Sequence, residues 1–154
     1  MSLTVRKAAF HDIAVLTQFL ADLFSIETDF LIDEARQREG LRLLLENDAA
    51  AIVLVAEHEG RPCAMLSGQI VVSTAMGAYS ILVEDMYVAP FIRRRGVATK
   101  LLEALEEWGR ERGASRMQMV ADRTNDVALA LYKKNNFVTG RMIALYRSFA
   151  EYNA

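Results

Sequence analysis

An apolar strand pattern followed by a helix that starts at a glycine dominates the middle of the sequence. Residues 80–90, SILVEDMYVAP, are apolar apart from two adjacent acids. Apolar residues at helical spacing begin at Val97 and continue to Trp108. Directly before this helix stand Arg93, Arg94, Arg95 and Gly96. A strand that leads through a short turn into an amphipathic helix is a unit of α/β architecture, so the sequence predicts an α/β fold.

The start of this helix has the chemistry of an anion site. The first N–H groups of a helix have no partner within it, and the helix dipole adds roughly half a positive charge there. Arginines are mildly unfavourable at such an end, so three of them indicate a negative ligand, with phosphate the usual one. Gly96 lets that ligand approach the backbone closely. Taken alone, the run is explained equally well as a solvated surface.

The rest of the chain predicts one mixed domain over residues 1–154. Strands are expected at residues 4–8, 80–88 and 116–121, and in a hairpin over residues 50–72 that turns at residues 59–62. Helices are expected to begin near Asp12, Asp33, Gly96 and Asn125, and a final pair of strands follows residue 135. The first half is then rich in antiparallel strands, and the second half reads β-α-β-α-β.

Two adjacent acids, Glu84 and Asp85, interrupt the apolar strand. Successive strand residues face opposite sides, so only Glu84 would share a face with Leu82 and Met86. A carboxylate on a covered face needs a partner, a cavity or a chemical role. One solvent-facing acid and one salt bridge would also explain the pattern.

Charge is distributed unevenly along the chain. The net charge of -2 disfavours a nucleic-acid binder. Residues 1–77 hold six basic and 11 acidic residues, whereas residues 78–154 hold 12 basic and nine acidic ones. No Lys or Arg lies between Lys7 and Arg36, but six acids do: Asp12, Asp22, Glu27, Asp29, Asp33 and Glu34. The second half of the chain therefore suits an anionic ligand, and the first half suits a cationic one. Helix caps and a solubilising surface explain the six acids before Arg36 equally well.

Several protein classes are disfavoured by missing motifs. The stretch from Gly96 to Lys100 lacks the Gly-Lys-Ser/Thr ending of a P-loop, and the glycine turn of a dinucleotide oxidoreductase is absent. Neither His11 nor His58 stands near a serine-hydrolase motif, and no zinc or haem motif occurs. Cys63 is expected to pack in a strand. The lone cysteine and the lack of a membrane-length or signal-like apolar run favour a cytoplasmic location.

The chain resembles the GCN5-related N-acetyltransferase (GNAT) superfamily. Residues 93–98, RRRGVA, resemble its acetyl-CoA signature Arg/Gln-x-x-Gly-x-Gly/Ala between a strand and a helix. Residues 125–137, NDVALALYKKNNF, resemble its Asn-x-x-Ala-x-x-Leu-Tyr-x-x-x-Gly-Phe. Asn136 replaces the usual glycine, and asparagine is the next-best residue for a left-handed helix end. The resemblance implies a mixed, mostly antiparallel sheet of six to seven strands flanked by about four helices.

The resemblance also implies how acetyl-CoA would be held as co-substrate. The pyrophosphate would lie on the helix start, and the pantetheine arm would lie along the strand before it and near the second motif. The residues implied in cofactor binding are Met86, Tyr87, Val88, Arg93, Arg94, Arg95, Gly96, Val97, Ala98, Thr99, Asn125, Ala128 and Tyr132. No metal site is implied.

Two of these positions are implied in catalysis. Glu84 occupies a position where members of the family often carry the base that takes a proton from the amine, directly or through water. Tyr132 would reach the thioester sulfur and protonate the leaving thiolate, whose ordinary pKa is about 8.5.

The acceptor is expected to be a primary amine, and a cationic small molecule is favoured by the acids before Arg36. Acetylation of a protein N-terminus or lysine, and a non-catalytic CoA-binding regulatory domain, remain alternatives. Members of the family are often dimers, so a homodimer is a further expectation. Neither nucleic acid nor membrane is expected as a partner.

Overall fold

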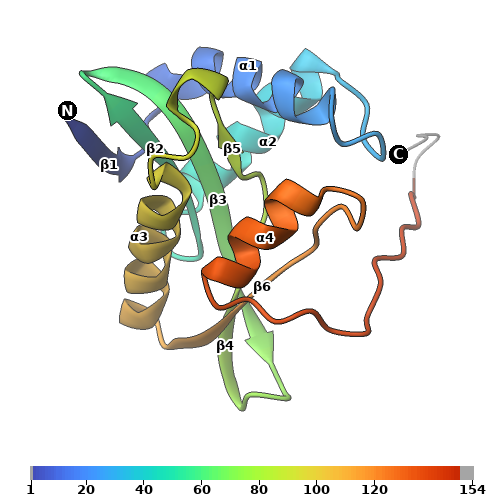
Figure 1. Ribbon diagram of the computed structural model, residues 1–154. Helices are drawn as coiled ribbons and strands as arrows, with labels where there is room; N and C mark the ends of the chain where they lie inside the picture. Colours follow the sequence, from blue (N-terminus) through green and yellow to red (C-terminus); the bar gives the residue numbers. More distant parts are fainter. Residues whose placement is uncertain (1, 150–154) are drawn as a thin grey trace.

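The computed structural model describes residues 2–149 and has strands and helices arranged around one sheet (Figure 1). In chain order the elements are β1 (Leu3–Lys7), the 3-10 helix η1 (Phe10–Asp12), α1 (Ile13–Phe24), α2 (Glu34–Glu46), β2 (Ala51–His58), β3 (Arg61–Ser73), β4 (Ala78–Val83), β5 (Tyr87–Val88), the 3-10 helix η2 (Pro90–Ile92), α3 (Val97–Glu111), β6 (Ala114–Met119) and α4 (Asp126–Lys134). This confirms the expected mixed architecture.

The sheet has the strand order β1-β2-β3-β4-β6, and β5 pairs with β3 beyond the end of β4. Every pair is antiparallel except β4 with β6. A parallel pair needs a long crossover, and α3 supplies it, so the predicted strand–turn–helix unit joins two neighbouring strands.

Helices cover both faces of this sheet. Gly68 of β3 lies under α3 so closely that an added Cβ would come within 2.7 Å of Leu105 Cδ1. Met65, three residues earlier in the same strand, faces the other side and pairs with Tyr87. The Tyr87 ring lies 5.3 Å from the Phe19 ring of α1, centroid to centroid. Helices α1 and α3 therefore lie on opposite faces, and the core fills both sides of β2 and β3.

Asp12 begins α1 as expected, but its carboxylate does not cap that helix. It accepts hydrogen bonds of 2.8 Å from Arg6 Nη1, Arg6 Nη2 and the Ala9 N–H. The guanidinium lowers the pKa of this buried carboxyl to about 2. Asp12 thus joins β1 to the start of α1 by an ion pair.

The expected strand at residues 80–88 and the expected final strands both need correction. The first is broken into β4 and β5 by residues 84–86. Residues 137–149 form no strand, because a strand needs a paired edge and this segment pairs with no described strand. Within residues 2–149, no helix is both long and apolar enough to cross a membrane.

Candidate active site

The break between β4 and β5 opens the sheet beside the expected site. Val83 pairs with Gly68 and Tyr87 pairs with Met65, so three residues, 84–86, lie opposite two residues of β3. This extra residue is a β-bulge, which bends a strand and redirects its side chains. Beyond the bulge, β5 pairs with β3. Strand β6 pairs with β4, and no pairing joins it to β5 within the described residues. The outer edge of β5 is consequently separated from β6.

Backbone groups of Val88 point to this outer edge. The Ala89 N–H donates to the Cys63 carbonyl at 2.8 Å, so the backbone hydrogen-bonding groups of Ala89 face β3. Hydrogen-bonding groups of successive strand residues alternate in direction, which turns those of Val88 away from β3. The Val88 carbonyl accepts a 2.8 Å hydrogen bond from Arg93 Nε on that side. An extended ligand arm could add to β5 there as a further strand would.

The first turn of α3 is open. Gly96 is its N-cap, with φ of 77°, and this residue has no side chain with which to cap the helix. A Cβ added to Gly96 would meet no described heavy atom within 4 Å. Arg94 also has a left-handed backbone, with φ of 63°. Uncapped N–H groups beside a glycine with free space fit a diphosphate.

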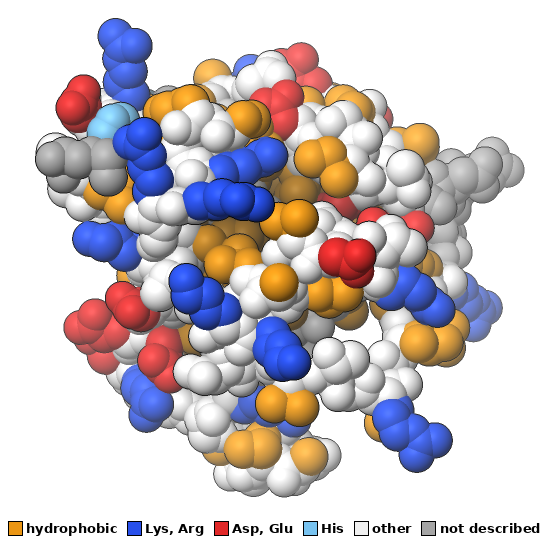
Figure 2. Space-filling model, viewed as in Figure 1, with side chains coloured by type: hydrophobic (Ala, Val, Ile, Leu, Met, Phe, Trp, Pro, Cys, Tyr) orange, Lys and Arg blue, Asp and Glu red, His pale blue; other side chains and the backbone are white. Residues whose placement is uncertain are grey.

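The three arginines do not share one role. Arg93 turns back to the sheet, where its guanidinium bonds the Val88 carbonyl and lies 5.9 Å from the centre of the Tyr87 ring. Arg94 and Arg95 are exposed beside the helix start. Figure 2 shows Lys and Arg side chains around a hollow that contains hydrophobic side chains on this face. A basic rim of this kind attracts anions.

Glu84 and Asp85 lie in the bulge. The Glu84 N–H donates to the Ser67 carbonyl at 2.9 Å, and Ser67 Oγ donates to Asp85 Oδ2 at 3.0 Å. Loss of solvent raises the pKa of both carboxyls, and the charge of Asp85 raises that of Glu84 further. Because residues 84–86 are no regular strand, the expected alternation fails. Asp85 is the more buried acid, although only Glu84 was expected to face inward.

Glu27, in the connection between α1 and α2, joins this group. Burial raises its pKa to about 6, and the charges of Asp85, Asp122, Asp29 and Glu84 contribute. Burial raises the pKa of Tyr132 on α4, and the charge of Glu27 raises it further. The two expected catalytic residues, Glu84 and Tyr132, are therefore both within electrostatic range of Glu27.

The structure gives the local environment of the other expected site residues. The Asn125 side chain accepts a 3.1 Å hydrogen bond from the Ala128 N–H, so it caps α4. Tyr87 is buried, and its hydroxyl donates to Asp22 Oδ2 at 3.2 Å. Val97 and Ala98 are buried in the first turn of α3, Thr99 is half-buried, and Met86 is the half-buried last residue of the bulge. Asn136 has φ of 70°, as expected for the end of α4.

Most acids before Arg36 have structural partners. Asp12 pairs with Arg6, Asp22 accepts from Gln18 and Tyr87, Asp33 caps α2, and Glu34 pairs with Arg38. Glu27 is the member of this set that lies within range of Glu84 and Tyr132. Sequence reasoning did not single out Glu27 or Asp85. Position in an acidic stretch was the signal for Glu27, and the adjacency of two acids in an apolar run was the signal for Asp85.

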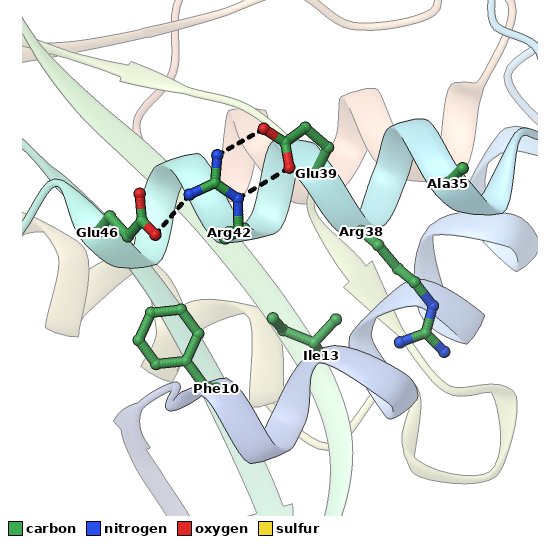
Figure 3. Close-up of a pocket in the computed structure, with 7 residues that line it drawn as sticks. All are labelled: Phe10, Ile13, Ala35, Arg38, Glu39, Arg42 and Glu46. Carbon is green, nitrogen blue, oxygen red and sulfur yellow. Dashed lines mark hydrogen bonds and ion pairs between the residues drawn. The ribbon is translucent and has the colours of Figure 1, made fainter.

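A separate groove lies between α1 and α2, far from these residues in the chain (Figure 3). Phe10 and Ile13 form one wall, and the facing side of α2 carries charged side chains. Arg42 bonds both Glu39 and Glu46, at 2.6 and 2.5 Å, so these charges are paired within α2. None of the expected site residues lines this groove.

Comparison with known proteins shows which family this chain resembles. The family model described as the acetyltransferase (GNAT) family matches residues 16–137. A thialysine N-epsilon-acetyltransferase of Caenorhabditis elegans is 33% identical over 102 residues, which cover 65% of this chain and 61% of that protein. The chain thus spans less than two thirds of that relative.

Solved structures share the fold over nearly the whole chain. An aminoglycoside acetyltransferase from an uncultured soil metagenomic sample has a TM-score of 0.75 and 28% identity, covering 97% of this chain and 100% of that one. AAC(6')-Iy in complex with the bisubstrate analogue CoA-S-monomethyl-acetylneamine has a TM-score of 0.82 and 16% identity, with the same two coverages.

Proposed function

The chain belongs to the acetyltransferase (GNAT) family, and we propose that it moves an acetyl group from acetyl-CoA to a primary amine of a cationic small molecule. One arrangement supports this proposal: Glu84 lies in the bulge at residues 84–86, where the strand is interrupted, and Glu27 interacts electrostatically with both Glu84 and Tyr132. In this proposal Glu84 is the proton acceptor, Tyr132 is the proton donor and Glu27 is an additional anionic group.

The residues beside this opening suit acetyl-CoA. We assign the diphosphate to the first turn of α3 at Gly96, because that turn is uncapped and unobstructed. The pantetheine arm is assigned to the outer edge of β5, at Met86 and Val88. When bound there, acetyl-CoA supplies an acetyl group activated as a thioester. Arg93 acts indirectly, since its bond to the Val88 carbonyl connects the helix start to β5.

Glu84 is assigned the role of base. An alkylamine with an ordinary pKa of about 10.4 is protonated at neutral pH and cannot attack until it loses a proton. The raised pKa of Glu84 makes its ionised carboxylate a stronger base than that of an ordinary glutamate. It takes the proton directly or through one water molecule.

Tyr132 is assigned the role of acid. Its raised pKa keeps the hydroxyl protonated over the whole neutral range, so it can donate to a sulfur that is leaving as thiolate. Its ring is held edge-on against Phe137, with centroids 5.8 Å apart, which orients the side chain on α4.

The charge around the acceptor side favours a cation. Burial raises the pKa of Glu27, and the negative charges of Asp85, Asp122, Asp29 and Glu84 raise it further. A bound ammonium group relieves this repulsion, whereas an anionic acceptor increases it. One structural neighbour is named an aminoglycoside acetyltransferase, and aminoglycosides carry several amino groups, which agrees with this assignment.

The direct test measures free thiol released from acetyl-CoA in the presence of a panel of amines. The panel contains a diamine, an aminoglycoside, an amino-dicarboxylate and a lysine peptide, and each product is identified by mass. We expect turnover with the diamine or aminoglycoside. Preference for the peptide would redirect the proposal to protein acetylation. Acetyl-CoA binding without turnover of any amine would support a regulatory CoA-binding domain instead.

Tyr132→Phe is expected to lower kcat about 10-fold, because the variant loses the proton donor and keeps the ring. Acetyl-CoA affinity and melting temperature should stay close to those of the parent. Steady-state kinetics, calorimetry and thermal denaturation measure the three quantities. A kcat within about twofold of the parent, under roughly 0.5 kcal/mol, would remove the acid role from Tyr132.

Glu27→Gln is expected to lower kcat/KM for a diamine about 5–10-fold at low salt. This change corresponds to the loss of about 1 kcal/mol of electrostatic attraction between the carboxylate and the ammonium group. The parent-to-variant ratio should rise with pH through about 6, where Glu27 ionises, and should shrink as salt is added.

The same variant should be more stable than the parent at pH 8. The folded pKa of Glu27, about 6, lies above its ordinary 4.5, so the ionised carboxylate disfavours the fold. This cost amounts to at most about 2 kcal/mol and disappears as the pH falls through 6 toward 4.5. Denaturant titrations at pH 8 and pH 4.5 test this sign. Glu103→Gln, an exposed change on α3, is the control. Equal diamine kinetics in both variants would exclude Glu27 from the acceptor site.

A further inference from the structure

Ser67 is a buried polar residue in the middle of β3. It is 1% exposed and lies in a stretch, residues 63–68, whose members are all buried. On the β2 side it pairs with Val53, whose side chain offers no hydrogen-bonding group. A buried hydroxyl that makes no hydrogen bond costs free energy, so this serine needs a partner on the other side of β3.

That partner is the bulge at residues 84–86. The Ser67 carbonyl accepts a hydrogen bond of 2.9 Å from the Glu84 N–H, and the Ser67 hydroxyl donates one of 3.0 Å to Asp85 Oδ2. A bulge disrupts the regular ladder of hydrogen bonds, because its strand has one residue more than the partner strand. Ser67 therefore holds both adjacent acids, one through its backbone and the other through its side chain.

The two acids differ in how firmly their carboxylates are held. Asp85 is half-buried, and one of its carboxylate oxygens accepts the bond from Ser67. The Glu84 side chain remains accessible to solvent, and no hydrogen bond or ion pair joins it to another side chain within residues 2–149. Ser67 thus distinguishes two neighbouring carboxylates, because it anchors one and leaves the other available to a substrate.

We propose that Ser67 is a positioning residue for acetyl transfer, which anchors Asp85 against β3 and fixes the bulge so that Glu84 is the carboxylate that meets the amine. This role rests on the proposed acetyl transfer with Glu84 as base. Because Ser67 is buried, it acts through the bulge and not by contact with a substrate. Without its hydroxyl, Asp85 loses its anchor, the bulge gains other conformations, and Glu84 is displaced from the amine.

Ser67→Ala removes the hydroxyl and keeps the backbone carbonyl. We expect kcat to fall about 10-fold, since a displacement of about 1 Å at a reacting group can cost up to about 100-fold in rate. Acetyl-CoA affinity, measured by calorimetry, should stay within about twofold of that of the parent. Amide hydrogen exchange at residues 84–86, measured by mass spectrometry without acetyl-CoA or amine, should become about 5-fold faster, as for the loss of one hydrogen bond.

Ser80→Ala is the matched control. Ser80 is a buried serine of β4, and its hydroxyl donates to the Arg116 carbonyl at 3.2 Å. This variant also loses one buried side-chain hydrogen bond, so its melting temperature should fall about as much as that of Ser67→Ala. Its kcat and its hydrogen exchange at residues 84–86 should stay those of the parent.

Two changes at Asp85 test the same bond from its other end. Asp85→Asn keeps an oxygen that can accept from the Ser67 hydroxyl, whereas Asp85→Ala removes the acceptor. Both variants lose the negative charge, so the difference between them reports the bond. We expect the kcat of Asp85→Ala to lie about 10-fold below that of Asp85→Asn, and the addition of Ser67→Ala to Asp85→Ala to change kcat less than about twofold.

A kcat in Ser67→Ala no lower than that in Ser80→Ala would overturn the proposal, and so would unchanged hydrogen exchange at residues 84–86. If Ser67→Ala does not fold, equal kcat in Asp85→Asn and Asp85→Ala would overturn it. Loss of activity in Glu84→Gln alone, with parental kcat in Ser67→Ala, would reject only the role of Ser67. Parental kcat in both Glu84→Gln and Ser67→Ala would reject the proposed base as well.

Discussion

Gly96→Glu is expected to weaken acetyl-CoA binding by more than about 100-fold, roughly 3 kcal/mol, when measured by calorimetry. The Gly96 backbone is left-handed, with φ of 77°, and the space beyond it is open. The new side chain would place a carboxylate in the space assigned to the diphosphate, and it would strain the backbone as well. Like charges at an uncapped helix start repel, whereas the peptide N–H groups there attract anions.

A matched variant separates backbone strain from the loss of the site. Gly77 in the hairpin between β3 and β4 also has a left-handed backbone, with φ of 61°, and open space around its Cα. Gly77→Glu should cost a similar amount of stability, about 1–2 kcal/mol, and leave acetyl-CoA affinity unchanged. Gly96→Ala adds strain without charge and should lie between parent and Gly96→Glu. Undiminished binding by Gly96→Glu would show that the diphosphate lies elsewhere.

Glu84→Gln is expected to lower kcat about 100-fold while changing acetyl-CoA affinity little. The amide has nearly the size of the carboxylate but cannot take up a proton at neutral pH. Glu103→Gln on α3 removes a charge from an exposed position and should retain parental kinetics. A parental kcat in Glu84→Gln would transfer the role of base to another group, and the neighbouring Asp85 would be tested next.

The pH dependence of the parent-to-variant ratio makes this test specific. Ionisation of the acceptor amine affects parent and variant alike, so it cancels in the ratio. The remaining rise follows deprotonation of Glu84, whose pKa is above the ordinary 4.5. The parent-to-variant ratio of kcat should therefore rise with pH and then become constant. The rise should occur at a higher pH than it would if Glu84 had the pKa of an ordinary glutamate. A ratio that is flat across this range would contradict a proton-accepting role.

Local sequence signals predicted the parts of the molecule that depend on local physics. Helix α3, its start at Gly96 and the left-handed end of α4 at Asn136 each follow from apolar spacing and from residues with particular backbone preferences. The hairpin of β2 and β3 follows from apolar runs around a turn. The starts of these helices and strands agree with the expected positions within two residues, whereas α3 ends at Glu111, three residues beyond the last residue of the expected apolar pattern.

Features that depend on pairing between distant strands could not be predicted in the same way. The bulge at residues 84–86 exists because β3 pairs with β4 and β5 in two registers, which no local pattern shows. The inward position of Asp85 and the approach of Glu27 depend on that bulge and on the packing of α1. The expected final strands were wrong for a related reason. The apolar pattern of a strand is a local property, but the strand forms only beside a partner strand, which the local sequence does not show.

The bulge also limits how this protein can vary in length. With one residue fewer between Val83 and Tyr87, β4 and β5 would pair with β3 in a single register and could run as one strand. The outer edge of β5 would then continue that of β4, and alternating residues would exchange faces. Substitutions at residues 84–86 change the chemistry of the opening, but a deletion there removes the opening itself. When relatives are aligned, a gap at this place is therefore more informative about lost activity than a changed residue.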